Sequence, residues 1–252
     1  MTPRRFSGFD FHCHVDLHQD PRAIIARCES ERVFTVAVTT TPKAYPTNAE
    51  WATDSAYVVP AIGLHPEVVA DRLDELPLLL SGMRRTAFVG EIGLDGSPQY
   101  KSSYPKQLEV FSEALKTAQA EGGKVVTVHS RRAARDVIDI IGKLTTPDNV
   151  LCILHWFSGS RSEMQQAAAA GCYFSVNANM LDNQKAAPLV SAIPKDRLLT
   201  ETDAPFGQTE SRVSVPWDVV DTARRLADRY KVEPARVYEN ALRVLRFAGV
   251  DD

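Results

Sequence analysis

Imidazoles and carboxylates recur in this 252-residue chain at the ends of short apolar runs. His12 and His14 lie two positions apart in the first run, so both side chains point to the same side of a strand, while Phe11 and Cys13 face the helical layer. Later runs end at, or lead into, the further candidates His65, Glu91, His129, His155 and Asp203. Imidazoles together with carboxylates favour zinc, manganese or another borderline divalent ion over an all-oxygen calcium site.

The same residues indicate hydrolysis. Glu91 has two oxygens and can bridge a pair of ions, and Asp203 can bind one ion and accept a proton from water, so both are catalytic candidates. Two ions roughly 3.5–4 Å apart stabilise the attacking and the leaving oxygen in phosphate-ester cleavage. The alternative, a set of separately hydrogen-bonded core histidines, requires five of the six histidines to reach strand ends by accident.

Eight runs of apolar or β-branched residues are spaced as the strands of a barrel require. They cover residues 9–15, 33–40, 58–64, 87–94, 125–129, 150–155, 173–176 and 198–202. Continuous apolar runs are typical of parallel strands buried on both faces. Since the carboxyl ends of barrel strands surround one pocket, this fold would bring the candidate residues together. We predict an α/β TIM (β/α)8 barrel that forms a single domain over residues 1–252.

Helix signals lie between these runs. Capping patterns place helix starts after Asp20, Ser103 and Ser160. The clearest predicted helices cover residues 104–121, 217–230 and 234–247. We expect these helices to pack around the outside of the barrel and to close it.

Charge and cysteine content limit the class of protein. A formal net charge of −3 argues against coating nucleic acid through bulk charge, so a polyanion would have to be held locally. Four widely spaced cysteines without a CxxC pair indicate reduced thiols, as in a cytoplasmic protein. No apolar stretch approaches the length of a membrane span. We therefore expect a cytoplasmic protein without a membrane segment.

Six motifs, found in this order along almost the whole chain, resemble those of the TatD family of metal-dependent deoxyribonucleases. They are Asp10-Phe11-His12-Cys13-His14, Gly63-Leu64-His65-Pro66, Gly90-Glu91-Ile92-Gly93-Leu94-Asp95, His129-Ser130-Arg131, His155-Trp156-Phe157-Ser158-Gly159 and Glu201-Thr202-Asp203-Ala204-Pro205. An HxH motif alone is unspecific, but the combination is highly specific.

The resemblance implies a TIM barrel with two divalent metal ions (zinc, manganese or magnesium) that hydrolyses DNA phosphodiesters, commonly as a 3′-to-5′ exonuclease on single strands. DNA is then the expected partner. The family's metal ligands fall on His12, His14, Glu91, His129, His155 and Asp203. His65 and Arg131 fall where the substrate phosphate is contacted.

Several departures from the family pattern lie around the expected pocket. Phe11 replaces a small hydroxyl residue, and Glu67 stands where a second histidine often follows. The loops at 96–98 and 206–208 also differ, and they resemble those of the TatD-like member of an anti-phage defence system. That narrower resemblance implies protein partners from such a system.

Residues beside the motifs have two interpretations each. Trp156 and Phe206 could stack a splayed base, or they could simply pack. Asp95 could orient a ligand or cap its loop. Arg132 and Arg135 fit a solvated helix face better than a phosphate site.

Two other functions remain open for the whole protein. One is hydrolysis of an amide, ester or aminoacyl-tRNA linkage on the same barrel. The other is a metal-binding subunit of a larger assembly without turnover.

Overall fold

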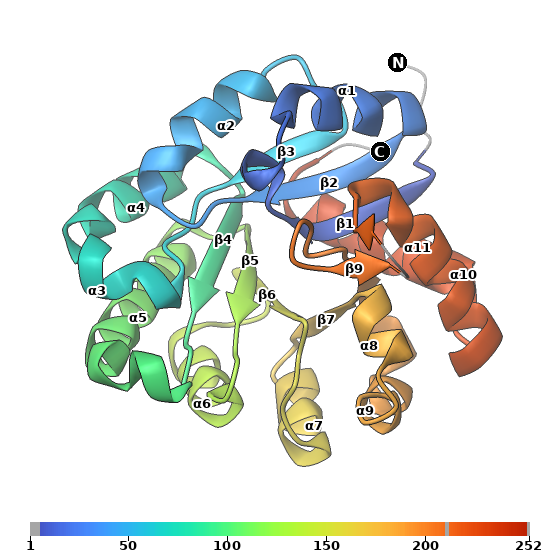
Figure 1. Cartoon of the computed structure of the whole chain (residues 1–252). Coiled ribbons are helices and arrows are strands. Elements are labelled where there is room, and N and C mark those ends of the chain that lie inside the picture. Colours follow the sequence, from blue (N-terminus) through green and yellow to red (C-terminus); the bar gives the residue numbers. More distant parts are fainter. Residues whose placement is uncertain (1–5, 210–211, 251–252) are drawn as a thin grey trace.

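Parallel strands and helices alternate along the chain in a computed structural model that describes residues 6–209 and 212–250 (Figure 1). Residues 1–5, 210–211 and 251–252 of the predicted domain lie outside this part. The eight barrel strands are β1 (Gly8–Cys13), β2 (Val33–Val38), β3 (Val58–Ala61), β4 (Phe88–Gly93), β5 (Lys124–His129), β6 (Val150–His155), β7 (Tyr173–Val176) and β8 (Leu198–Thr200). Each lies within or beside one predicted run, which confirms the predicted barrel strands.

The strands form two parallel sheets, β1 to β3 and β4 to β8, that meet at two seams. At the first seam the Gly90 amide donates to the Ile62 carbonyl oxygen at 2.8 Å. At the second seam the Asp203 amide donates to the His12 carbonyl oxygen, also at 2.8 Å. These bonds close the barrel. A short antiparallel pair, β9 (Gln208–Thr209) and β10 (Arg212–Val213), follows the last barrel strand.

The barrel interior is filled by apolar side chains from all eight strands. Phe11 belongs to this interior cluster with Phe9 and Phe34, so its predicted position facing the helices is wrong. A β-bulge between Asp10 and Cys13 is the reason, because the extra residue shifts the side-chain alternation of the strand. Cys13 lies beyond the bulge and packs on the helix side, as predicted.

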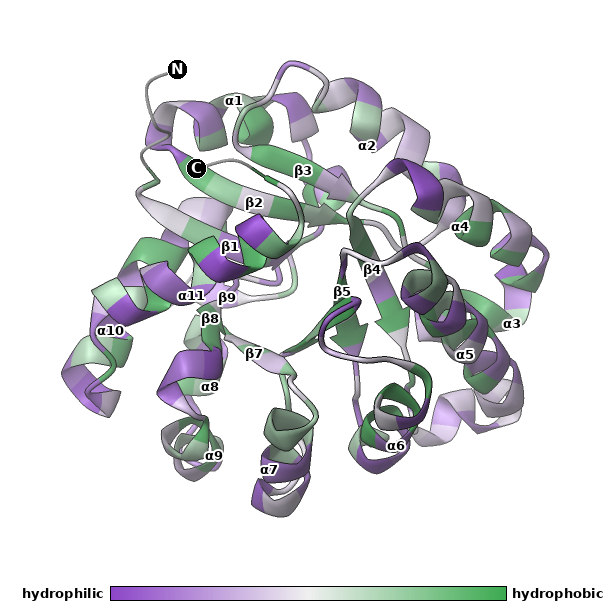
Figure 2. Cartoon of the chain, turned by 180° about the vertical axis from the view of Figure 1, so that it is seen from behind, coloured by the Kyte–Doolittle hydropathy of each residue, from purple (hydrophilic) through white to green (hydrophobic). Residues whose placement is uncertain are grey.

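Helices surround the barrel (Figure 1). They are α1 (Pro21–Glu31), α2 (Tyr45–Trp51), α3 (Val69–Arg72), α4 (Leu76–Gly82), α5 (Tyr104–Glu121), α6 (Ala134–Leu144), α7 (Arg161–Ala169), α8 (Ala178–Asp182), α9 (Ala187–Ala192), α10 (Val219–Tyr230) and α11 (Pro234–Phe247). In Figure 2 the strands are mainly hydrophobic, whereas the helices carry hydrophilic residues as well. None of the helices in the described ranges combines the length and the apolar character needed to cross a membrane.

Two of the three predicted helix caps are confirmed. Asp20 accepts a hydrogen bond from the Ala23 amide, and Ser160 forms a capping box with Glu163. Ser103 makes no such bond, because a 3-10 turn precedes α5 and its hydroxyl donates instead to the Tyr100 carbonyl oxygen. The helix predicted from residue 217 begins as a 3-10 turn and becomes α-helical at residue 219.

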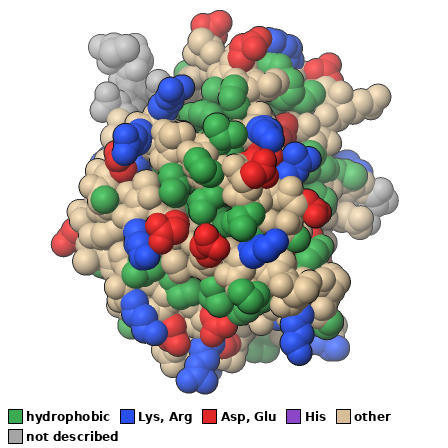
Figure 3. All heavy atoms as spheres, turned by 90° about the vertical axis from the view of Figure 1, so that its left-hand side faces the viewer, with side chains coloured by type: hydrophobic (Ala, Val, Ile, Leu, Met, Phe, Trp, Pro, Cys, Tyr) green, Lys and Arg blue, Asp and Glu red, His purple; other side chains and the backbone are tan. Residues whose placement is uncertain are grey.

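The last helix leaves the carboxyl ends of the strands open. The Asn240 side chain donates to the carbonyl oxygens of Lys195 and Leu198, next to the start of β8. α11 therefore lies at the amino ends of the strands, and the loops at the opposite end line the pocket described below. On the face shown in Figure 3, acidic and basic side chains are interspersed.

Candidate metal centre

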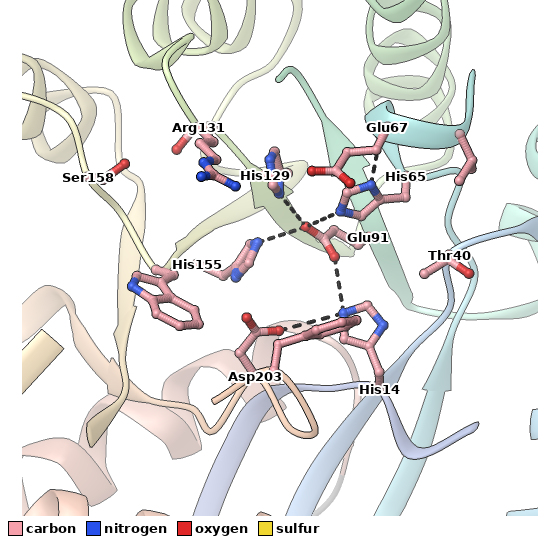
Figure 4. A pocket seen from close by; sticks show the side chains of 14 residues that line it. His14, Thr40, His65, Glu67, Glu91, His129, Arg131, His155, Ser158 and Asp203 are labelled. Atoms are coloured by element: carbon pink, nitrogen blue, oxygen red, sulfur yellow. Dashed lines mark hydrogen bonds and ion pairs between the residues drawn. The ribbon is translucent and has the colours of Figure 1, made fainter. Parts of the chain in front are cut away.

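A pocket of about 590 Å³ lies at the carboxyl ends of the strands (Figure 4). It is lined by His14, Thr40, His65, Glu67, Val68, Glu91, His129, Ser130, Arg131, His155, Trp156, Ser158, Asp203 and Phe206. Seven of the eight candidate residues line this pocket, and the eighth, His12, is fully buried directly beneath Glu91 and Asp203. The fold thus brings together all eight of these candidate residues.

Glu91 lies at the centre of the site, and its Oε2 atom faces the first strand. This oxygen is 3.2 Å from His12 Nε2 and 3.3 Å from His14 Nε2. Asp203 Oδ1 lies 3.6 Å from the same two nitrogens. Two imidazoles and two carboxylates therefore converge on this side of Glu91.

The other oxygen, Oε1, faces a second set of imidazoles. It lies 2.7 Å from His129 Nδ1, 2.8 Å from His155 Nε2 and 3.2 Å from His65 Nε2. His65 was expected at the substrate phosphate. Its Nε2 atom also lies in the same donor cluster as Glu91 and His129, and its role at the phosphate stays a prediction.

Two glycines allow this arrangement. A Cβ atom added to Gly63 would lie 2.2 Å from the Glu91 amide nitrogen, so only glycine lets β3 approach β4 this closely. A Cβ atom on Gly90 would lie 2.1 Å from Thr127 Cγ2. The glycines of both motifs therefore act by placing the Glu91 backbone.

Neighbouring side chains hold the outer nitrogens of two imidazoles. Thr127 Oγ1 lies 2.6 Å from His12 Nδ1, and Asp95 Oδ2 lies 3.0 Å from His129 Nε2. Asp95 Oδ1 also accepts a hydrogen bond from the Ser97 amide, so Asp95 both contacts a candidate ligand and caps its loop. The role of Thr127 was missed in the sequence, although it lies on the same strand face as His129.

Burial and charge set the protonation of these groups. Burial by itself would raise the pKa of Glu91, but the surrounding imidazoles, His65 foremost, hold that pKa well below its usual range. Burial, reinforced by the nearby Glu91 charge, raises the pKa of Asp203 well above its usual range. Burial would lower the pKa of His129, yet its hydrogen bonds to Asp95 and Glu91 raise it to about 9.

The donor atoms fit divalent cations. His12 Nε2 is buried and forms no hydrogen bond with any described residue, although carboxylate oxygens of Glu91 and Asp203 lie on its open side. Four overlapping groups of donor atoms among the described residues lie close enough to hold an ion, namely His12/His14/Glu91, His12/His155/Asp203, His65/Glu91/His129 and Glu67/Asp95/His129. Imidazoles and carboxylates are the ligands that borderline divalent ions prefer. Glu91 belongs to two of these groups, as a bridging ligand would.

Arg131 lies beside the cluster. Figure 4 shows its side chain on the same side of the site as His129. No ion pair within the described residues engages its guanidinium group. Arg132 and Arg135 are exposed and line a different cavity.

The aromatic residues of the sixth-strand motif and of the last loop separate into two classes. Phe157 is 1% exposed and packs on Phe174, so it is a core residue. Trp156 and Phe206 line the pocket. Glu67 also lines it, and its carboxylate accepts a hydrogen bond from the Tyr100 hydroxyl at 2.7 Å.

Comparisons with known proteins identify the family of this chain. The family model described as "TatD related DNase" matches residues 9–246. The uncharacterised metal-dependent hydrolase YabD of Bacillus subtilis is 31% identical over 79% of this chain and 80% of its own length. The 3′-5′ ssDNA/RNA exonuclease TatD of Erwinia amylovora is 32% identical over 57% of both chains. The crystal structure of YjjV, a TatD homologue from Escherichia coli, superposes with a TM-score of 0.82 at 22% identity, covering 96% of this chain and 97% of YjjV.

Proposed function

This chain belongs to the TatD-related DNase family of metal-dependent hydrolases, and we propose that it cleaves the phosphodiester bonds of single-stranded DNA as a 3′-to-5′ exonuclease. The observation that carries the proposal is the position of Glu91, whose two oxygens face two different sets of imidazoles. A carboxylate in that position can bridge two ions, the arrangement suited to phosphodiester cleavage. The activity for which the Erwinia relative is named supports the direction and the strandedness.

Six residues would hold the ions. On one side of Glu91 these are His12, His14 and Asp203, and on the other side they are His129 and His155. The high share of imidazole favours zinc or manganese over magnesium. Bound divalent cations supply Lewis acidity toward the phosphate and lower the pKa of water.

The protein's own groups bind the phosphate and move the proton. Arg131 can donate two parallel hydrogen bonds to phosphate oxygens, and His65 lies on the same side of the pocket. Asp203 is the proton acceptor. Its Oδ1 atom lies 3.6 Å from His12 Nε2 and from His14 Nε2, so the carboxylate faces the proposed ion site, where it can accept a proton from the attacking water.

The test is digestion of single-stranded DNA labelled at either end, with zinc, manganese or magnesium added in turn. A 5′ label should yield a ladder of shortened products, whereas a 3′ label should be released at once as a mononucleotide. Glu91→Gln should lower the rate by more than about 100-fold, because even outer-shell partners of a metal site cost 10–100-fold. Glu113→Gln changes an exposed carboxylate on α5 and should leave the rate unchanged. Intact DNA under all three ions would refute the proposal.

Partners from an anti-phage system stay a prediction. They rest on the loops at 96–98 and 206–208, and Phe206 of the second loop lines the pocket. Co-purification of the chain with proteins encoded beside it would test that role separately from DNA cleavage.

A further inference from the structure

Phe206 is the most exposed large hydrophobic side chain among the described residues, at 57%. The others are Leu17, Leu78, Val213 and Val220, which are all aliphatic and do not line the metal pocket. A single exposed apolar residue is ordinary on a protein surface. Here, however, the exposed residue is a flat ring that lines the pocket of the proposed catalytic centre.

The backbone fixes the position of this ring. The amides of Phe206 and Gly207 both donate to the Asp203 carbonyl oxygen, at 2.8 and 2.9 Å. A Cβ atom on Gly207 would lie 2.1 Å from the Thr202 carbonyl oxygen, so glycine is required in this turn. The ring meets the His14 imidazole edge-on, with centroids 5.2 Å apart at 87°. Phe206 is thus tied to two proposed metal ligands.

The backbone of Trp156, directly after the strand that ends at His155, is also fixed by its surroundings. Its φ angle is +37°, a left-handed conformation that a bulky residue rarely adopts. The Trp156 amide donates to Glu201 Oε1 at 3.1 Å, and that buried carboxylate is itself held by Ser175 and Asn177. The surrounding hydrogen bonds therefore maintain a conformation that places the indole at the pocket wall.

The same cavity offers binding groups for both parts of a nucleotide. Arg131 offers the phosphate a guanidinium group that forms no ion pair with any described residue, while Trp156 and Phe206 offer aromatic rings. The cavity, at about 590 Å³, has the size typical of small-molecule sites, roughly 300–1,000 Å³. A flat, apolar group attached to a phosphate matches these features, and a nucleobase is such a group.

We propose that Phe206 and Trp156 form a stacking platform for the unpaired base next to the scissile phosphate. The inference rests on the proposed nuclease function and specifies its substrate, because a base stacked within a duplex has no free face to offer. Stacking on an aromatic side chain is worth roughly 5- to 150-fold in affinity per base. The platform therefore makes the enzyme select nucleotides with an unpaired base.

The test compares two ligands that share a phosphate, deoxyadenosine 5′-monophosphate and deoxyribose 5-phosphate. Neither contains a phosphodiester, so calorimetry on the metal-loaded protein measures binding without turnover. Phe206→Ala should weaken binding of the nucleotide at least 5-fold and leave the sugar phosphate unchanged. Phe206→Tyr should restore nucleotide affinity, and Leu78→Ala, an equally simple truncation on exposed α4, should change neither ligand.

Two results would overturn the platform. One is equal loss of both ligands in Phe206→Ala, and the other is unchanged nucleotide affinity in that variant. The outcome is independent of DNA cleavage. If the protein binds the nucleotide through its base but cleaves no DNA, the proposed nuclease function is refuted and the stacking platform stands. If it cleaves DNA but binds both ligands equally, the nuclease function stands and the platform is refuted.

Discussion

His129 lies between two carboxylates, with Nδ1 2.7 Å from Glu91 Oε1 and Nε2 3.0 Å from Asp95 Oδ2. When Nε2–H donates to Asp95, the lone pair of Nδ1 is directed at the side of Glu91 where an ion would bind. Asp95 is held in turn by the Ser97 amide, in the loop that departs from the family pattern. The altered loop thus keeps the carboxylate that orients a proposed ligand.

Asp95→Asn should weaken binding of one ion by about 10–100-fold, because the neutral amide accepts a weaker hydrogen bond from His129. Metal content after dialysis against limiting zinc checks this by elemental analysis. We expect about one ion retained in the variant and two in the wild type. Equal retention in both proteins would show that Asp95 serves only its loop.

Removal of metal should lower the melting temperature. Cations that bind only the folded chain stabilise it by about 2.7 kcal/mol at a concentration 100 times the Kd. For a domain of this size that corresponds to roughly 5–10 °C. Thermal unfolding of chelator-treated protein, before and after zinc is restored, measures the shift. A melting temperature that does not change when zinc is added would argue against metal binding at this site.

Arg131→Ala should raise KM for DNA by roughly 10-fold or more, since a hydrogen bond to a charged group is worth about 1.5–3 kcal/mol. Arg132→Ala is the matched control, because its neighbouring side chain lines another cavity. Steady-state kinetics at fixed ionic strength separate the two variants. Equal effects would mean that the arginines act only through general charge.

Asp10 makes stability depend on pH. Burial raises its pKa to about 7, against about 4 in the unfolded chain. Its stabilising contribution is therefore complete below about pH 4 and is lost as the pH rises to about 7. The side chain introduced by Asp10→Asn cannot ionise, so this variant does not lose stability for this reason as the pH rises.

The free energy of unfolding of the wild type, minus that of Asp10→Asn, should fall by up to roughly 4 kcal/mol between about pH 4 and about pH 7. Above about pH 7 the difference should be constant. Urea titrations of both chelated proteins across this range give the curve. A difference that does not vary with pH would place the titration elsewhere.

The barrel was predictable because its strands are apolar on both faces, so the runs stand out in the sequence. The strand ends were less predictable. β1 ends at Cys13 and not at residue 15, since the His14 backbone already bonds to Ala204 of the last loop. The predicted direction of the Phe11 side chain was wrong because the bulge adds a residue to the strand, and nothing in the local sequence indicates a bulge.

The candidate ligands were found because their residue types are unusual at strand ends. Of their hydrogen-bonding partners, Asp95 was found in the sequence but Thr127 was not, because the contact of Thr127 with His12 joins strands distant in sequence. Such pairs depend on how β1 and β5 face each other across the barrel. That relationship follows from closure of the whole sheet and not from any local pattern.

The two seams of the barrel give the centre a role in assembly. Glu91 lies at the seam between β3 and β4, while His12 and Asp203 lie at the seam between β8 and β1. A cation held by these residues would cross-link the first strand of the barrel to the loop that follows the last strand. A growing polypeptide that has not yet docked β8 lacks Asp203 at this position. Full metal uptake would therefore mark the moment at which the barrel is complete.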